Sequence, residues 1–361
     1  MNEKTLWYTR CPLPTAFSIA IHTGLFEKQV RQAGGQAQSL RHSDIQEVRL
    51  SHFTHTYPGM IRQGGHIPPL WSRSEGRDVR LIGLSWTNEA QLLLTLPDSG
   101  IDEVRALKGK RLAVPYRKKF PVDFWRATVL KGFSDVLATA GLTLKDVELV
   151  DIDVEDQPFN RQYTRPGTVS PPGTAYQTFS SQRLEARALI RKEVDAIFSP
   201  GHYGVALSAF IGAHVLFDGA SLSNRLDKTN NPTLLAFTVD GAFYDRHPEI
   251  VTAAVRSTLE AANYAKAHQI ESARIVAAES GNPEELIPVI FGDDFADDLR
   301  PSFSDEQLGA LERQNHFLYK HGFLPRIVPV SEWIEPAALE QARALSITEK
   351  TSPTLITEDI V

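Results

Sequence analysis

Residues 5–24, TLWYTRCPLPTAFSIAIHTG, carry the pattern from which the fold class of this 361-residue chain follows. The first part, Thr5 to Thr9, is rich in aromatic and β-branched side chains and predicts a strand. The segment from Pro14 to Thr23 has apolar residues at helical spacing and predicts a helix, which Gly24 ends. A strand followed at once by a helix is half of a βαβ unit, so we expect sheets covered by helices.

The same alternation continues along most of the chain. Further strands are predicted at residues 36–40, 79–84, 91–96, 111–114, 147–152, 196–199, 214–217 and 234–239, and long C-terminal helices at 247–268, 271–279, 304–321 and 331–345. Ser304 and Gln307 form a candidate capping box for the third of these helices. Strands that alternate with helices favour parallel pairing through crossovers. The predicted fold class is therefore α/β, with mixed or parallel sheets and helices on both faces.

Two stretches rich in turn residues predict crossings between two lobes. They are LPDSG at 96–100 and the polar stretch at 221–233. The length also favours two domains, each with its own core. We therefore expect lobe I to comprise residues 1–97 and 225–361, and lobe II residues 98–224. A run rich in proline and glycine at 157–176 predicts a long loop of the kind that often covers a site.

Composition and charge indicate a soluble globular protein. Apolar residues make up 42% of the chain and charged residues 23%, with a net charge of -6, which excludes the disordered and collagenous classes. The mild acidity favours no nucleic-acid partner, and one cysteine cannot form an intrachain disulfide. Neither a signal-peptide pattern nor a run of roughly 18 apolar residues is present. We expect a cytoplasmic, monomeric protein with no membrane attachment.

The single cysteine, Cys11, lies at the junction of the first predicted strand and helix. A thiolate at a helix N-terminus is stabilised by unpaired N–H groups and by the helix dipole, so this position suits a reactive thiol. The alternative is a buried cysteine that acts as a small hydrophobe. No GxSxG, Walker or GxGxxG motif offers competing machinery for hydrolysis, nucleotide binding or dinucleotide binding. Cys11 is therefore the candidate nucleophile of the chain.

A second unusual region is SHFTHTYPGMIRQGGHIPPLW at residues 51–71. It contains three histidines, His52, His55 and His66, which raises the question of a metal site. No cysteine or carboxylate lies between residues 48 and 74, and no HExxH arrangement is present. We therefore expect no metal site in this region.

Arg62 and the pair Gly64-Gly65 predict an oxyanion site in this region. Successive glycines can turn their N–H groups toward an anion, although a tight turn would need the same residues. The prolines of IPPL at 67–70 favour a helix start, whose N-terminus adds partial positive charge. Arg62 supplies a planar fork that suits a two-oxygen anion such as a carboxylate, sulfinate or sulfonate.

Together these segments resemble those of one enzyme family. YTRCPLP at 8–14, HFT at 52–54 and RQGGHIPPL at 62–70 are similar to motifs of the 2'-hydroxybiphenyl-2-sulfinate desulfinases of the biodesulfurisation pathway. The similarity extends to the C-terminal third, at FGDDF 291–295, LER 311–313, FL 317–318 and Trp333. It covers most of the chain in order and is weakest between about residues 115 and 230.

The resemblance implies a type II periplasmic-binding-protein-like fold, with two α/β lobes and the substrate in the cleft between them. The cysteine, histidine, arginine and glycine that line the family's site fall by motif on Cys11, His52, Arg62 and Gly65. Arg10 departs from the pattern, in which a small neutral polar residue precedes the cysteine. An additional cation there would alter thiol acidity or substrate choice.

The activity implied by the resemblance is cofactor-free cleavage of the carbon–sulfur bond of a small anionic aromatic sulfinate, with release of sulfite. Arg62 would bind the two oxygens of the sulfinate, and the Gly64-Gly65 amides would donate to the acceptor positions on these oxygens that Arg62 does not use. Cys11 would either attack sulfur as a thiolate or protonate the ring carbon as a thiol. His52 would orient water, bind the sulfinate or set the position of the thiol proton.

Two other functions stay open at this point. One is a non-catalytic solute-binding or sensor protein for an organosulfur anion, and the other is a pyrimidine-synthase-like relative in which histidines hold iron. Aromatic residues of the predicted lobe II are candidate walls for an aromatic ring, although residues at such positions are more often part of a core. These candidates are Phe124, Trp125, Phe159 and Tyr203.

Overall fold

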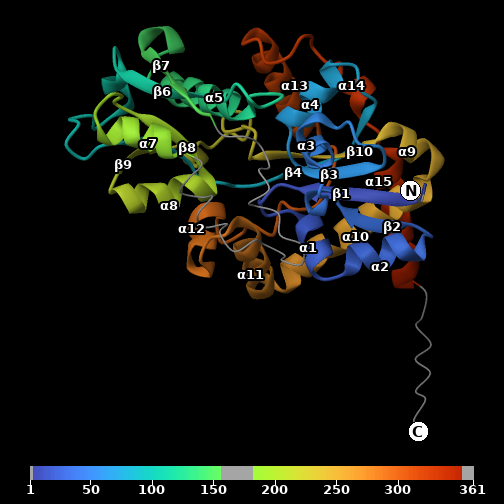
Figure 1. The fold of residues 1–361 in the computed structure, drawn as a ribbon. Helices are drawn as coiled ribbons and strands as arrows, with labels where there is room; N and C mark the ends of the chain where they lie inside the picture. Colours follow the sequence, from blue (N-terminus) through green and yellow to red (C-terminus); the bar gives the residue numbers. More distant parts are fainter. Residues whose placement is uncertain (1–2, 156–181, 352–361) are drawn as a thin grey trace.

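The computed structural model describes residues 3–155 and 182–351, so the predicted loop at 157–176 and Phe159 lie outside the described residues. Figure 1 shows the strands in two groups that lie side by side. One group is a five-stranded sheet with the order β2-β1-β3-β10-β4. The other consists of a three-stranded sheet, β8-β5-β9, and the pair β6-β7.

All nine predicted strands are present, each with its ends within two residues of the prediction. The five-stranded sheet contains β1 (Thr5–Arg10), β2 (Gln36–Ser39), β3 (Met60–Gly65), β4 (Val79–Trp86) and β10 (Leu234–Asp240), and the second group contains β5 (Gln91–Thr95), β6 (Arg111–Tyr116), β7 (Glu148–Asp153), β8 (Ile197–Pro200) and β9 (His214–Asp218). The sequence analysis missed β3, whose residues MIRQGG are all buried. Neither an alternating pattern nor high β propensity marks such a strand.

The sheets are mixed. β1 pairs in parallel with β2 and β3, and β6 pairs in parallel with β7, as expected for βαβ units. By contrast, β10 runs antiparallel between β3 and β4, and β5 runs antiparallel to both β8 and β9. Because β10 follows the second group in the sequence, the five-stranded sheet is built from two separate parts of the chain.

The first crossing between the two groups lies earlier than the predicted residue 97. β5 pairs with β8 and β9, so it belongs to the second group, and the chain crosses between Trp86 and Gln91. The turn residues at 96–100 follow β5 inside the second group, which is why they are a misleading boundary signal. The chain returns between β9 and β10.

The helices cover the sheets. Before the crossing come α1 (Ala16–His22), α2 (Leu25–Gln32), α3 (Gln46–Thr54) and α4 (Ile67–Ser74); between the crossings come α5 (Phe124–Thr139), α7 (Arg183–Ile190) and α8 (Gly201–Ile211); after the return come α9 (Gly241–Arg246), α10 (Pro248–Ala267), α11 (Gln269–Ser280), α12 (Ile287–Phe291), α13 (Asp305–Lys320), α14 (Val330–Trp333) and α15 (Ala337–Thr351). The capping box at Ser304 is confirmed. The predicted helix at 331–345 is divided into α14 and α15, because Pro336 interrupts it.

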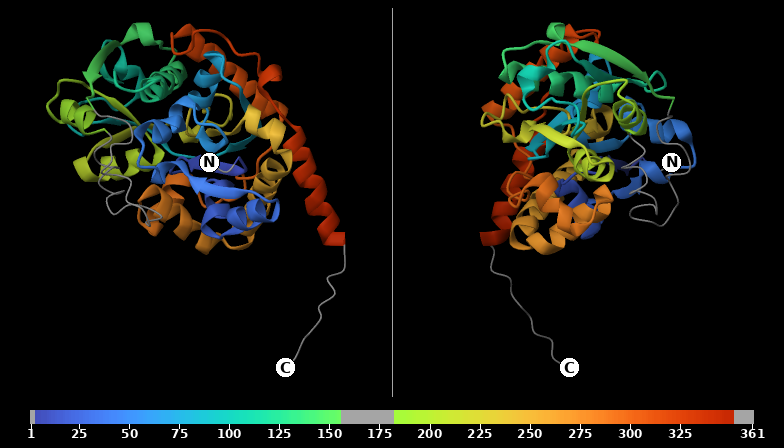
Figure 2. Two further views of the ribbon diagram at one scale, coloured as in Figure 1. Left: turned by 45° about the vertical axis from the view of Figure 1, so that its right-hand side comes forward. Right: turned by 90° about the vertical axis from the view of Figure 1, so that its left-hand side faces the viewer.

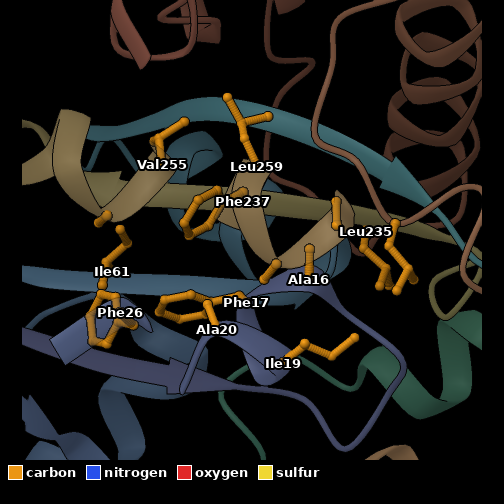
Figure 3. Packing of buried hydrophobic residues seen from close by; sticks show 14 of the residues in the cluster. Ala16, Phe17, Ile19, Ala20, Phe26, Ile61, Leu235, Phe237, Val255 and Leu259 are labelled. Atoms are coloured by element: carbon orange, nitrogen blue, oxygen red, sulfur yellow. The ribbon is translucent and has the colours of Figure 1, made fainter. Parts of the chain in front are cut away.

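Alternate residues of β10 enter two different cores. Leu235 and Phe237 pack with α1 and α10, whereas Leu234 and Ala236 pack with α4 and α13. Figure 3 shows the first of these cores, where the ring of Phe17 from α1 lies 5.1 Å from that of Phe237. Both faces of the sheet are therefore covered, as predicted. This packing holds α1 against the sheet and fixes where the segment between β1 and α1 lies.

The C-terminal helix α15 lies far from the second group of strands. It runs along the outer side of the part that contains the five-stranded sheet, as Figure 2 shows in two further views. Within residues 3–155 and 182–351, no helix combines the length and the apolar character that a membrane span requires.

Candidate active site

Cys11 directly follows β1, at the edge where the parallel strands β1 and β3 end. Its N–H donates to the carbonyl oxygen of Gln63 at 3.0 Å. The prediction that Cys11 lies at a helix N-terminus is wrong, because α1 begins at Ala16 after the N-cap Thr15. The helix dipole acts mainly within the first turn, so it does not reach Cys11 effectively. The positive charge at the thiol comes from side chains instead.

The sulfur of Cys11 lies between His52 and Arg62. Its Sγ is 3.7 Å from Nε2 of His52 on α3, and Nη2 of Arg62 on β3 donates to it at 3.3 Å. Nη1 of Arg62 donates to the carbonyl oxygen of Gly65 at 2.9 Å, which fixes the guanidinium plane. The three residues predicted to be catalytic are therefore neighbours, although they come from three different elements.

His52 is held as a neutral imidazole. It is buried, and its Nδ1 lies 2.8 Å from the Thr9 hydroxyl of β1. Burial lowers the pKa of His52 well below its usual value, and the charges of Arg62 and Arg41 lower it further. The ring is therefore uncharged near neutral pH. It can share one hydrogen with Cys11 Sγ, either as donor or as acceptor according to its tautomer.

Arg62 is a buried cation with no carboxylate partner among the described residues. Its side chain is 1% exposed, and burial lowers its pKa whereas Cys11 raises it. Nε has no hydrogen-bond partner in the described part of the chain. A guanidinium carries five N–H donors, and Gly65 and Cys11 are the only described residues that accept from any of them. Arg62 can therefore donate to an anion placed beside the sulfur.

Gly64 and Gly65 lie in β3 and pair with β10, so the prediction that both glycine N–H groups turn toward one anion is wrong. Successive residues of a strand point their N–H groups in opposite directions, so the two amides do not converge on one anion. Glycine is needed here for space. A Cβ on Gly64 would lie 2.3 Å from Cys11 Sγ, and one on Gly65 would lie 2.5 Å from Asn231 Oδ1.

The helix predicted at 67–70 is present as α4, with prolines in its first turn. The main-chain N–H of Ile67, the first residue of α4, is already paired, because it donates to Asn231 Oδ1 at 3.0 Å. Asn231 comes from the segment that returns from the second group of strands to β10. The helix N-terminus is therefore satisfied within the protein and is not open to an anion at Ile67.

The other two histidines of this region do not contact Cys11. Nδ1 of His66 lies 2.9 Å from the Leu234 carbonyl oxygen, and burial lowers the pKa of His66 to about 4. His55 lies at the end of α3, and burial holds its pKa well below the usual value. In the described residues, no three His, Cys, Asp or Glu side chains are grouped so that they could hold a metal ion.

Arg10 is paired with a buried carboxylate from α11. Its Nε donates to Oε1 of Glu279 at 2.9 Å, its Nη2 bonds to the same oxygen, and His22 Nε2 lies 2.6 Å from it. Burial alone would raise the pKa of Glu279, but Arg10 and His22 hold it below its usual value. The cation that departs from the family pattern is therefore neutralised.

The sequence analysis missed Arg41, a second cation near Cys11. It lies in a short 3-10 helix, η1 (Leu40–His42), and its Nη2 donates to the main-chain carbonyl of Arg10. Burial and the charge of Arg10 lower the pKa of Arg41, while Cys11 raises it. No motif marks this residue, because one arginine in a polar stretch is typical of an exposed loop.

A row of aromatic rings begins at His52 and leads into the second group of elements. Phe53 meets the His52 ring edge-on, with centroids 4.8 Å apart. It then stacks on Phe124 of α5 at 5.5 Å and contacts Phe120 at 5.7 Å. The sequence analysis missed Phe53 and Phe120 as parts of this row, since nothing local distinguishes them from core residues.

The row continues to α8. Trp125 meets Phe124 at 6.1 Å and meets Tyr203 edge-on at 5.0 Å. Three of the four predicted wall residues are therefore side by side, and the fourth, Phe159, lies outside the described residues. A continuous row of aromatic side chains thus extends from the thiol site into α5 and α8, where Trp125 also belongs to a hydrophobic core.

Comparison with known proteins agrees with this architecture. No protein-family model matches the chain. It is 27% identical over 368 residues to the 2'-hydroxybiphenyl-2-sulfinate desulfinase of Rhodococcus erythropolis, and 94% of each chain is covered. A crystal structure of a cysteine-to-serine mutant of DSZB in complex with biphenyl-2-sulfinic acid has a TM-score of 0.75 and 24% identity, with 94% of this chain and 99% of that chain covered.

A binding protein also shares the fold. The periplasmic aliphatic sulphonate binding protein SsuA from Escherichia coli has a TM-score of 0.63 and 17% identity, and 92% of each chain is covered. The fold is therefore the α/β fold of type II periplasmic binding proteins, and the predicted fold class is confirmed. Within that class, the chain is a distant relative of the desulfinase over 94% of its length, and it shares its fold with a sulfonate-binding protein.

Proposed function

We propose that this protein is a cofactor-free desulfinase that cleaves the carbon–sulfur bond of an aromatic sulfinate and releases sulfite. The observation that carries the proposal is the contact of Cys11 Sγ with Arg62, a buried cation that has no carboxylate partner in the described residues. The full-length similarity to a desulfinase supports it. The biphenyl-2-sulfinic acid bound to DSZB supports an aromatic sulfinate as the ligand. We also propose that the protein acts in the cytoplasm as a monomer.

The sulfinate would bind next to the thiol. Its two oxygens carry one negative charge, and the unpartnered Nε–H of Arg62 offers a donor that is not used within the described protein. Arg41, whose charge also acts on Cys11, would add to the attraction. The aromatic part of the substrate would then lie along the row that begins at Phe53.

Two routes to sulfite fit these residues. In the first, the Cys11 thiolate attacks sulfur, so that an S–S bond forms and the carbon–sulfur bond breaks. The electron pair goes to the ring carbon, which takes up a proton, and water cleaves the S–S bond to give sulfite. In the second, the Cys11 thiol protonates the ring carbon that bears sulfur. The carbon–sulfur bond then breaks and its electron pair restores the aromaticity of the ring. The released sulfur dioxide adds water to give sulfite.

His52 and Arg62 have a part in both routes. Arg62 donates to Sγ and would stabilise the thiolate, whether it is the attacking group or is left after proton donation. Neutral His52 would hold or return the thiol hydrogen, with its ring fixed by Thr9. An imidazolium paired with a thiolate is disfavoured, because burial and the nearby arginines oppose a charge on His52.

Sulfite release is the decisive experiment. Purified protein is incubated, without added metal, with a panel of aryl sulfinates that includes hydroxybiphenyl sulfinate. The expected result is sulfite formation that Cys11→Ser reduces on the order of a thousandfold, since a hydroxyl lacks the acidity and softness of a thiol. Circular dichroism of Cys11→Ser checks that the fold is intact. Tight binding of sulfinates or sulfonates without sulfite would contradict the proposal and favour a solute-binding or sensor protein.

The same preparation distinguishes the two routes. Rapid acid quenching followed by peptide mass spectrometry detects a sulfur dioxide adduct on Cys11 if the thiolate attacks sulfur. An adduct that appears and decays at the rate of turnover assigns the first route. Turnover with no adduct at any quench time favours proton donation.

A further inference from the structure

A second histidine with a carboxylate partner lies near the far end of the aromatic row. Glu89, in the crossing between β4 and β5, is fully buried. Its Oε1 accepts hydrogen bonds from Nδ1 and from the main-chain N–H of His202, each at 3.0 Å. His202 lies in the first turn of α8 and is 5% exposed. Neither residue belongs to the Cys11 site described above.

The main chain is shaped to fit this pair. A Cβ on Gly201 would lie 1.9 Å from Oε1 of Glu89, so only glycine lets the carboxylate lie against the start of α8. The N–H of Gly201 also donates to the carbonyl oxygen of Ala90 at 2.6 Å. The crossing segment and α8 are therefore joined at this point, and His202 is held at one oxygen of Glu89 by two hydrogen bonds, one from its main chain and one from its imidazole.

The carboxylate sets the tautomer of the imidazole. Oε1 of Glu89 faces Nδ1 of His202 and also accepts from the main-chain N–H of that residue, so the hydrogen between the ring and the carboxylate lies on Nδ1. In the tautomer that carries its hydrogen there, Nε2 keeps a lone pair. That Nε2 is buried and has no hydrogen-bond partner in the described part of the protein. Buried polar atoms are nearly always paired, so an oriented acceptor without a partner points to a ligand that supplies the donor.

The acceptor lies beside the proposed substrate region. The ring of His202 contacts that of Tyr203 at 3.8 Å, and Tyr203 meets Trp125 in the row that leads to His52. The charge of Arg41 interacts with both Tyr203 and Cys11, which links α8 to the thiol site independently of the row. Nε1 of Trp125 is likewise buried and has no partner among the described residues.

We propose that His202, oriented by Glu89, recognises a hydrogen-bond donor on the aromatic part of the substrate, most simply a phenolic hydroxyl distant from the sulfinate. This inference rests on the proposed function and deepens it. The hydroxyl donates to Nε2 of His202, and its oxygen is free to accept from Trp125 Nε1. His202 is then a specificity-determining residue, and Glu89 is the positioning residue that keeps the lone pair on Nε2.

The expected signature is discrimination between two ligands. A site built to bond a polar group rejects an analogue that lacks it, because its own buried polar atoms are left unpaired. The probes are biphenyl-2-sulfinate and the same compound with a hydroxyl on the second ring. Calorimetric binding to Cys11→Ser measures this without turnover, and we expect the hydroxylated ligand to bind at least about tenfold more tightly.

The variants isolate the role of the imidazole. Added to Cys11→Ser, His202→Phe is expected to abolish the preference while the affinity for the unsubstituted ligand stays within about twofold. His202→Gln, which keeps a hydrogen-bonding group, is expected to retain part of the preference. His214→Gln, at an exposed histidine of β9, is the matched control and is expected to change neither affinity.

Glu89 has a readout of its own. Nitrogen-15 NMR of the histidine rings is expected to show His202 protonated on Nδ1, and Glu89→Gln is expected to populate the other tautomer and to reduce the ligand preference. A merely structural role for Glu89 would leave the tautomer unchanged.

Two outcomes overturn the inference. The first is equal affinity of Cys11→Ser for the two ligands. The second is a His202→Phe variant that keeps the preference, or that loses it only because its affinity for both ligands falls to the same low value. Failure of the proposed function looks different, because wild-type protein would then release no sulfite while the preference for the hydroxylated ligand persists in Cys11→Ser.

Discussion

Two buried arginines on neighbouring strands flank Cys11, and they have opposite surroundings. Arg10 on β1 is bound by Glu279, so its charge is neutralised inside the protein. Arg62 on β3 is more deeply buried, yet among residues 3–155 and 182–351 it donates only to Gly65 and to the sulfur of Cys11. Both side chains sit in the same sheet, and only one of them meets a carboxylate within the described chain.

Under the proposed function, this difference separates a structural cation, Arg10, from one that binds substrate, Arg62. A buried charge is costly unless a partner compensates for it, and proteins normally supply that partner. Glu279 supplies it for Arg10, whereas under the proposed function the partner of Arg62 is a sulfinate bound beside the sulfur of Cys11. The following predictions test this contrast, in order of decreasing effect.

The largest effect is expected at Arg62. Arg62→Met removes the cation beside the sulfur and is expected to lower kcat/KM for an aryl sulfinate on the order of a thousandfold. Arg62→Lys, which replaces a planar fork by a point charge, is expected to lower it roughly tenfold to a hundredfold. Steady-state sulfite release gives both values. If Arg62→Lys binds sulfinate as tightly as wild type, Arg62 does not form the anion site.

The next effect tests the space that the sulfur needs beside Arg62. Gly64→Ala would bring a Cβ to 2.3 Å from Cys11 Sγ, so the thiol must move. A displacement of this size is expected to lower kcat about a hundredfold. Gly309→Ala is the control, because a Cβ on Gly309 of α13 would meet no neighbouring atom within 4 Å, and it should gain about 1 kcal/mol of stability. Equal activity of the two variants would contradict this view of Gly64.

A substitution at Arg10 should change mainly the stability of the fold and have little effect on turnover. Arg10→Met leaves the buried Glu279 carboxylate with His22 alone, and it is expected to lower the free energy of unfolding by about 3 kcal/mol. Sulfinate turnover should fall far less than in Arg62→Met. Urea unfolding and sulfite assays on the same samples separate the two effects, and the double variant with Glu279→Leu should regain part of the loss. A large loss of turnover at unchanged stability would place Arg10 in the site.

The smallest effect concerns the neutral histidines on the Arg62 side. The folded-state pKa of His66 is about 4, below its usual value of 6.5. Between these values the unfolded chain binds a proton that the folded protein does not. The contribution of neutral His66 to the free energy of unfolding is therefore fully present above pH 6.5 and is lost as the pH falls toward 4. His52 and His55, whose pKa values are also lowered, act in the same direction. Urea unfolding across this range should show a shallower decline in His66→Gln, and an unchanged slope would count against a neutral His66.

Local sequence was sufficient for much of the architecture. Nine strands and the long C-terminal helices follow from periodicities of two and of 3.6 residues, which depend only on neighbours along the chain. Cys11, His52 and Arg62 could likewise be selected as candidates from their residue types and motifs. Their proximity, 3.7 Å and 3.3 Å from the sulfur, is a property of the folded chain.

The features that needed the tertiary structure all depend on distant residues. β3 becomes a strand because β1 and β10 pair with it on either side, although MIRQGG has no strand pattern of its own. The pairing of Arg10 with Glu279 joins residues 269 positions apart, and that of Glu89 with His202 joins residues 113 positions apart. By itself the sequence determined which secondary structures form and which residues can do chemistry. Only the tertiary structure decided which buried charge has a partner, because burial and pairing are set by elements that meet through folding.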